Sequence, residues 1–89
     1  MTRSADLLTA ARARALFTSD VSASSQPSPV EVAAAIRRAV RMYGGSQGCA
    51  AEVAAAYGDH PETAAPRMRW ARGVIETVYA PASRILRAA

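Results

Sequence analysis

Alanine is the feature that most restricts how this chain can fold. The chain has 22 alanines among its 89 residues, and they recur in short runs from end to end. Alanine has the strongest helix propensity of all residues, but its small side chain removes little apolar surface from water. The sequence therefore predicts an all-α fold in which helices approach one another closely through alanine-lined faces.

The spacing of apolar residues predicts one domain over residues 1–89, built as a small bundle of four to five helices. A serine-rich stretch without a regular apolar pattern separates an N-terminal helix from a helical core at 29–89. The linker covers residues 18–28. The first three predicted helices span residues 4–17, 29–43 and 46–57. A fourth follows a turn at 60–64 and runs to about residue 79, and a fifth spans 81–89.

Local chemistry predicts where several helices begin and end. Ser28, Pro29 and Glu31 have the order of a capping box with proline in the first helical position. Gly44 is expected to close that helix in the left-handed conformation, and Ser46 to cap the next one. Asp59 and Glu62 form a possible capping box for a fourth helix, which Pro66 would then kink. Alternatively, Thr63 caps a later start with Pro66 in the first turn, and we prefer this arrangement, with a short turn at 60–64.

The small core limits the stability expected of an isolated chain. A domain of this size buries only about 60–65% of the surface that its unfolded chain exposes. Large apolar side chains are few, so each helix pair contributes little buried area. We therefore expect a homodimer, or a complex with a protein partner, to complete the core.

A helix-turn-helix motif is the sharpest functional prediction. Ala54 and Gly58 have the spacing of the small residue at the fifth position of the first helix and the turn glycine at the ninth. Pro66 interrupts the regular pattern, so the turn is expected to be longer and the recognition face to begin at Arg67. The alternative is an ordinary helical hairpin with a solvated arginine face.

The basic residues support that prediction. All eleven are arginines, and the net charge is +4 at pH 7. The guanidinium fork matches phosphate oxygens and base edges, although a GC-rich genome also favours arginine over lysine. We expect a small DNA-associated regulator or accessory protein that binds double-stranded DNA. The predicted contacts are Arg67, Arg69 and Arg72, with Arg37, Arg38 and Arg41 as auxiliary phosphate contacts.

A second function class fits the same pattern. The chain could be a helical interaction or oligomerisation module that binds a protein partner through alanine-lined faces, without any contact to nucleic acid. Large amphipathic side chains are enriched in such interfaces. The predicted partner interface consists of Trp70, Ile75 and Tyr79.

Catalytic and cofactor-binding patterns are missing from the sequence. Cys49 is the single cysteine and His60 the single histidine, so no zinc set and no cysteine–histidine pair can be assembled. We predict a protein that is not an enzyme and has no cofactor or metal, with Cys49 as a buried thiol. No apolar run approaches membrane-spanning length, and arginines interrupt any signal-peptide core, so a cytoplasmic location is expected.

The string GCAAEVAAAYGDHPETAAPRMRWA, preceded by SSQPSPVEVAAAI, resembles short proteins of actinobacteria to which no activity is assigned. The resemblance covers residues 24 to about 72 and implies a small domain of the bacterial cytoplasm, without implying a function. Residues 50–72 also resemble helix-turn-helix DNA-binding proteins, from whose pattern Pro66 and Arg67 depart.

Overall fold

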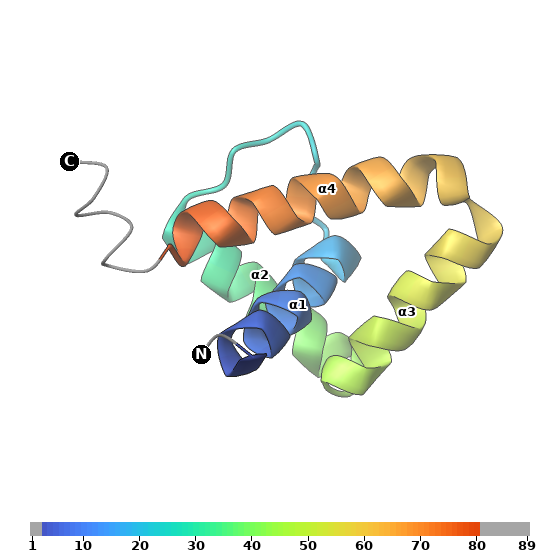
Figure 1. Ribbon diagram of the computed structural model, residues 1–89, viewed down its shortest axis with the longest axis horizontal. Coiled ribbons are helices and arrows are strands. Elements are labelled where there is room, and N and C mark those ends of the chain that lie inside the picture. Colours follow the sequence, from blue (N-terminus) through green and yellow to red (C-terminus); the bar gives the residue numbers. More distant parts are fainter. Residues whose placement is uncertain (1–2, 81–89) are drawn as a thin grey trace.

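The computed structural model describes residues 3–80, with side chains from residue 6 onward. This part of the chain forms four helices and contains no strand (Figure 1). The all-α prediction is therefore confirmed for the described residues, and the predicted helix at 81–89 lies outside them. The helices are α1 (Arg3–Thr18), α2 (Pro29–Tyr43), α3 (Ser46–Asp59) and α4 (Pro61–Val78).

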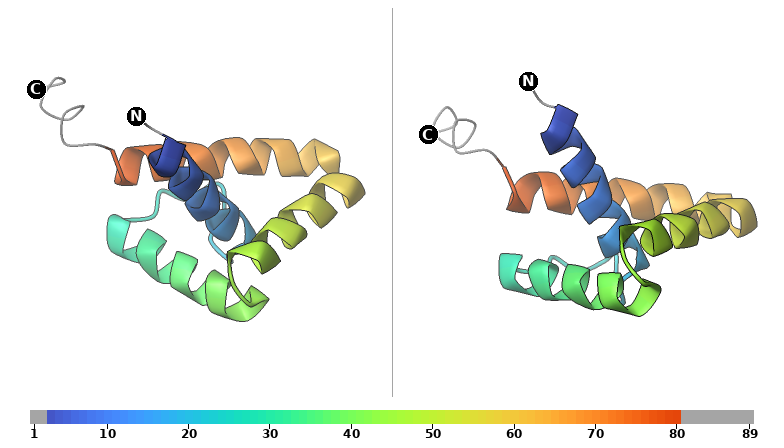
Figure 2. Two further views of the ribbon diagram at one scale, coloured as in Figure 1. Left: turned by 60° about the horizontal axis from the view of Figure 1, so that its bottom comes forward. Right: turned by 90° about the horizontal axis from the view of Figure 1, so that it is seen from below.

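Helix α1 is the centre of the arrangement. It packs against each of the other three helices, and α3 also packs against α2 and α4. Figure 2 shows α1 crossing α4, with the C-terminal end of α1 between α4 and α2, while the loop after α1 leads across to the start of α2. The end of α1 is thus the point at which three helices and a loop must be held together.

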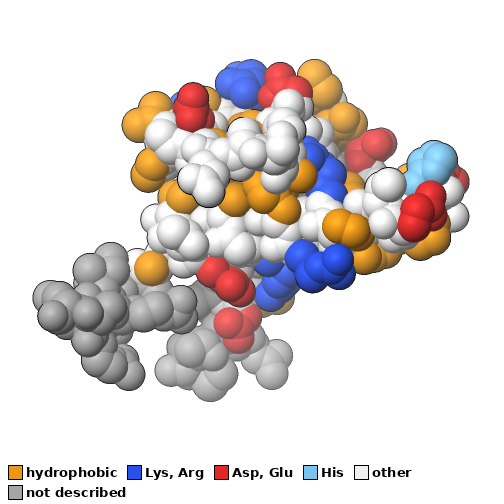
Figure 3. Space-filling model, turned by 90° about the horizontal axis from the view of Figure 1, so that it is seen from above, with side chains coloured by type: hydrophobic (Ala, Val, Ile, Leu, Met, Phe, Trp, Pro, Cys, Tyr) orange, Lys and Arg blue, Asp and Glu red, His pale blue; other side chains and the backbone are white. Residues whose placement is uncertain are grey.

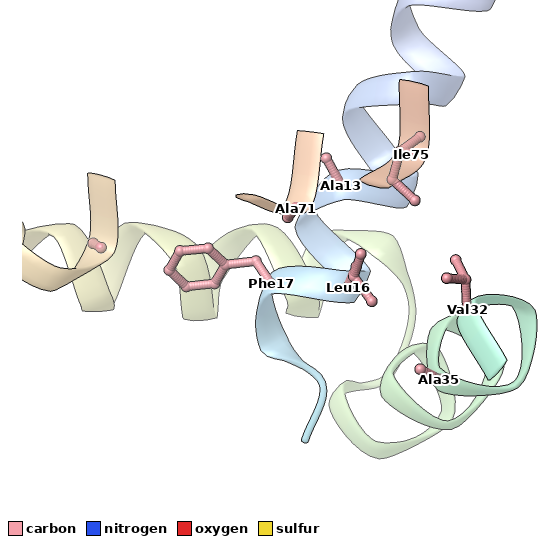
Figure 4. Close-up of a cluster of buried hydrophobic side chains, with 8 residues drawn as sticks. Ala13, Leu16, Phe17, Val32, Ala35, Ala71 and Ile75 are labelled. Atoms are coloured by element: carbon pink, nitrogen blue, oxygen red, sulfur yellow. The ribbon is translucent and has the colours of Figure 1, made fainter. Parts of the chain in front are cut away.

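Alanine lines the core as the composition predicts. The main cluster combines the buried side chains of Leu16, Phe17, Val32 and Ile75 with four alanines (Figure 4). These alanines are Ala13, Ala35, Ala64 and Ala71. Their small side chains allow the helices to pack closely, so each large residue reaches across to a neighbouring helix. Full burial of a Leu, Ile or Val side chain stabilises the fold by about 1.5–3 kcal/mol.

The boundaries of α2 agree with the sequence prediction. The Glu31 N–H donates to Ser28 Oγ at 3.2 Å, and the Ser28 N–H donates to the Glu31 carboxylate at 2.7 Å. This reciprocal pair is the predicted capping box. Gly44 closes the helix with φ 75° and ψ 32°, the left-handed conformation that glycine adopts without a steric penalty.

The turn from α2 to α3 differs from the prediction at Ser46. Ser46 is the first residue of α3, and Gly45 precedes the helix without any side-chain cap. The turn depends instead on a close approach at Gly48, where an added Cβ would overlap the carbonyl oxygen of Tyr43. The end of α2 therefore touches the first turn of α3, and only glycine leaves room for this contact.

The junction between α3 and α4 is shorter than predicted. Helix α3 continues through Gly58 to Asp59, and α4 begins at Pro61, so the expected turn at 60–64 is wrong. Proline suits this first helical position because its fixed φ matches the helix. The predicted side-chain cap from Asp59 and Glu62 is also absent from this junction.

Pro66 lies inside α4 and does not delay its start. Proline removes the N–H that would bond to the carbonyl four residues earlier, that of Glu62. Both residues are exposed, so water can hydrate that carbonyl and the loss is small enough for α4 to continue. The helix formed by residues 61–78 is consequently longer than the sequence pattern suggested.

Candidate functional site

The Arg67 side chain does not face outward, as was predicted, but packs against the end of α1. Its side chain is half-buried, and its Nε–H donates to the Phe17 carbonyl oxygen at 2.7 Å. Its Nη2 group donates to the carbonyl oxygens of Ser19 and Val21, each at 2.9 Å. One guanidinium from α4 thereby holds the last turn of α1 and the beginning of the loop that follows it.

The surroundings of Arg67 reinforce this role. Its guanidinium carbon lies 4.9 Å from the ring centroid of Trp70 and 5.8 Å from that of Phe17. Partial burial lowers the pKa of Arg67 through desolvation, but arginine stays protonated in proteins. The positive charge is also favourable at the C-terminal end of α1, where helix carbonyls point outward. We therefore remove Arg67 from the set of arginines that can contact a partner.

The sequence contained a sign of this role. Arg67 is three residues after Ala64 and four before Ala71, and both of these alanines are buried. The same spacing that defines the buried stripe of α4 places Arg67 beside it. Its neighbours Arg69 and Arg72 fall outside the stripe and are exposed, as predicted.

Ala54 and Gly58 do not have the packing and turn roles that the helix-turn-helix prediction assigned to them. Ala54 is exposed, because α3 packs through Cys49, Val53 and Ala56 instead. Gly58 does not have a positive φ, and an added Cβ there would meet nothing within 4 Å. Helices α3 and α4 do meet at a short junction near Gly58, but neither residue is required by its packing.

The predicted partner interface divides into three different environments. Ile75 is fully buried in the core, so its prediction as an interface residue is wrong. Tyr79 is half-buried, and the Arg12 guanidinium carbon covers its ring at 3.8 Å from the centroid. Trp70 is half-buried at the surface, and its indole N–H donates to the Ser25 carbonyl oxygen at 3.4 Å.

The outer face of α2 brings basic and apolar side chains together. Val30 is 77% exposed and Met42 is 75% exposed, although both are large apolar residues. They share one ridge of the helix with Ala34 and Arg38, because these four residues are spaced by four. We call Val30, Ala34, Arg38 and Met42 the α2 ridge. The exposed arginines Arg37 and Arg41 lie on the same helix beside it.

Two grooves accompany the α2 ridge. One, of about 330 Å³, runs from the end of α1 to Met42 and Tyr43. The other, of about 470 Å³, lies between the loop and Val30. Asp20 and Arg38 line both grooves and form an ion pair with 3.4 Å between the Arg38 Nη2 and an Asp20 carboxylate oxygen. Both side chains are largely exposed, so this pair is weak and can exchange for another partner.

Residues with catalytic potential do not converge in the described part of the chain. Cys49 is buried, and its sulfur lies 3.7 Å from Thr18 Oγ1 and 3.8 Å from the Ala39 carbonyl oxygen. His60 is exposed, with its Nδ1 4.0 Å from a Glu62 carboxylate oxygen. Among residues 3–80, no three His, Cys, Asp or Glu side chains are placed to hold a metal ion.

Comparisons with protein families, with curated proteins and with solved structures found no match to this chain. Within the described residues, none of the helices combines the length and the apolar character that crossing a membrane requires.

Proposed function

We propose that this chain is a small helical binding module that recognises an acidic protein partner through the α2 ridge and its flanking arginines. The observation that supports the proposal is the exposure of Val30 and Met42 on the same ridge as Arg38. The proposal keeps the interaction-module class predicted from the sequence, but moves the interface from α4 to α2.

The composition of the ridge favours a protein partner. Isolated exposed apolar residues are common on protein surfaces, but here they lie at both ends of one ridge, about 18 Å apart at 1.5 Å per residue. Arg and Met are enriched in protein interfaces, and the unbranched Met side chain adapts to the shape of a partner. A partner that offers apolar groups at this separation and carboxylates between them would satisfy the whole surface.

The positive charge on and beside the α2 ridge favours a negatively charged partner. Arg37, Arg38 and Arg41 carry three positive charges within five residues of α2, and Asp20 is the acid that pairs with one of them. Glu31 is engaged in the capping box at the other end of the helix. A carboxylate from a partner can form bidentate hydrogen bonds with a guanidinium, which favours acidic partners over basic ones.

Double-stranded DNA is the second candidate. Five of the six arginines predicted to contact nucleic acid are exposed: Arg37, Arg38, Arg41, Arg69 and Arg72. The net charge of +4 also favours binding to nucleic acid, whereas the junction at His60 is shorter than the turn of about three to four residues in a helix-turn-helix motif. Phosphate contacts of this kind depend steeply on salt and gain nothing from Val30 or Met42.

Fluorescence anisotropy with two labelled probes separates these candidates. One probe is an acidic amphipathic peptide of about 18 residues, with leucines spaced by four and glutamates beside them, and the other is a mixed-sequence DNA duplex. We expect Val30→Ser/Met42→Ser to weaken peptide binding at least about tenfold, which corresponds to about 1.4 kcal/mol. Arg37→Gln/Arg38→Gln/Arg41→Gln should weaken it similarly, and the control Arg69→Gln/Arg72→Gln, which removes two positive charges from α4, should not.

Two outcomes would contradict an acidic protein partner, and each points to a different occupant of the surface. Binding of the duplex that falls steeply between about 50 and 200 mM salt, and that the Val30/Met42 variant retains, would replace the protein partner by DNA. The predicted homodimer would appear in sedimentation equilibrium as a mass that grows with concentration. Its loss in the Val30/Met42 variant would make a second copy the occupant of the ridge.

A further inference from the structure

A third groove, of about 560 Å³, lies between α4 and the loop that precedes α2. Its apolar lining comes from Pro27 of the loop and from Trp70, Val74 and Val78 of α4, and its polar lining from Ser25, Gln26, Arg69 and Thr77. The face seen in Figure 3 looks onto α4 and this loop, and basic side chains lie beside the apolar ones there. The volume falls within the range of about 300–1,000 Å³ that is typical of small-molecule sites.

Several hydrogen bonds hold the loop that forms one wall of this groove. Arg67 holds the start of the loop through the carbonyl oxygens of Ser19 and Val21. Within the loop, the Ser25 hydroxyl donates to the Ser22 carbonyl oxygen at 2.7 Å. The Trp70 indole N–H reaches the Ser25 carbonyl oxygen. A groove that is formed in advance requires little ordering when a ligand enters, which favours binding.

Two features of α4 define what the groove can accept. The exposed Arg69 lines it and supplies a cation at the border of the apolar walls. Gly73 also lines it, and an added Cβ at this position would meet nothing within 4 Å, so the groove is open above the helix there. An apolar surface next to one guanidinium matches a molecule with a hydrocarbon body and a single carboxylate.

We propose that this groove binds a small amphiphilic carboxylate, whose hydrocarbon chain lies along Trp70, Val74 and Val78 and whose carboxylate pairs with Arg69. A chain of about eight carbons fits comfortably in the volume of the groove. The site goes beyond the proposed function and does not depend on it, because none of the four residues of the α2 ridge lines this groove.

Trp70 provides the measurement, because it is the single tryptophan of the chain and lines the groove. Octanoate, octanol and inorganic phosphate are each titrated against the full chain while Trp70 emission and backbone amide NMR shifts are followed. We expect octanoate to bind saturably and at least about tenfold more tightly than octanol, because octanol lacks the charge that pairs with Arg69. Inorganic phosphate lacks the apolar body and should bind more weakly than octanoate.

Three substitutions at exposed positions of α4 complete the test. Arg69→Gln should make octanoate and octanol equivalent, and the control Arg72→Gln should leave both affinities unchanged. Gly73→Leu fills the open part of the groove and should abolish octanoate binding, while circular dichroism shows that the helices are retained. Equal affinity of the unaltered chain for octanoate and octanol, or undiminished octanoate binding by Gly73→Leu or Arg69→Gln, would overturn the proposal. Octanoate binding should persist in the Val30/Met42 variant, so failure at one site does not imply failure at the other.

Discussion

Replacement of Arg67 by methionine should destabilise the fold strongly, because the guanidinium makes three hydrogen bonds that methionine cannot make. The bonds run to the carbonyl oxygens of Phe17, Ser19 and Val21 at 2.7–2.9 Å. A hydrogen bond that involves a charged group contributes about 1.5–3 kcal/mol to stability. Since Arg67 is only half-buried, water can hydrate part of the carbonyl oxygens that lose their partner. We therefore expect the free energy of unfolding to fall by about 3 kcal/mol in total.

That loss is large for a domain of this size. Small domains have unfolding free energies of about 5–15 kcal/mol, and 1 kcal/mol shifts the Tm of such a domain by about 4–8 °C. Arg67→Met should therefore lower the Tm by about 12–24 °C. Urea unfolding followed by circular dichroism and by Trp70 emission gives the free energy, and agreement between the two probes checks that unfolding is two-state.

Two further variants test the reasoning behind this magnitude. Arg67→Lys keeps the charge but loses the planar fork and its stacking on Trp70, so it should recover only part of the lost stability. Arg69→Met makes the same exchange two residues away, at an exposed position, and should change the stability by less than about 0.5 kcal/mol. The account of Arg67 is refuted if Arg67→Met and Arg69→Met unfold at the same urea concentration.

Three other predictions concern residues within α3 and α4 and can be checked by thermal unfolding or thiol chemistry. Gly48→Ala should destabilise the fold by about 3 kcal/mol, because the added Cβ would overlap the Tyr43 carbonyl oxygen. The control Gly58→Ala should be neutral or stabilising, and equal effects of the two substitutions would contradict the close approach at Gly48. Cys49 should react with Ellman's reagent only at the rate of unfolding, since its thiol is buried, and fast labelling of the folded chain would disprove its burial. Pro66→Ala should stabilise α4 by about 1 kcal/mol or more by restoring a backbone hydrogen bond to Glu62, and a lower Tm would argue against it.

The parts of the fold that depend on local chemistry could be predicted from the sequence. The start of α2 follows from Ser28, Pro29 and Glu31, whose capping box needs no contact from elsewhere in the chain. The end of α2 at Gly44 is equally local, because only backbone conformation decides it. Alanine content likewise predicted a helical fold with small side chains in the core.

Other features depend on distant residues and could not be derived in this way. The spacing within α4 places Arg67 beside the buried stripe, but its hydrogen bonds arise because α4 crosses the end of α1, about fifty residues earlier in the chain. Gly48 is required by the position of the Tyr43 carbonyl, which spacing alone does not reveal. The rotation of α3 that exposes Ala54 follows from which face contacts α1, and several faces of an alanine-rich helix look alike in sequence.

The binding of the acidic amphipathic peptide to the Val30→Ser/Met42→Ser variant tests the proposed function most directly. These residues are about three-quarters exposed, so their replacement should leave the Tm nearly unchanged and isolate the effect on binding. We predict that the unaltered chain binds the peptide and that the variant binds it at least about tenfold more weakly at the same salt concentration. Equal affinities of the two proteins for the peptide would contradict a partner-binding role for the α2 ridge.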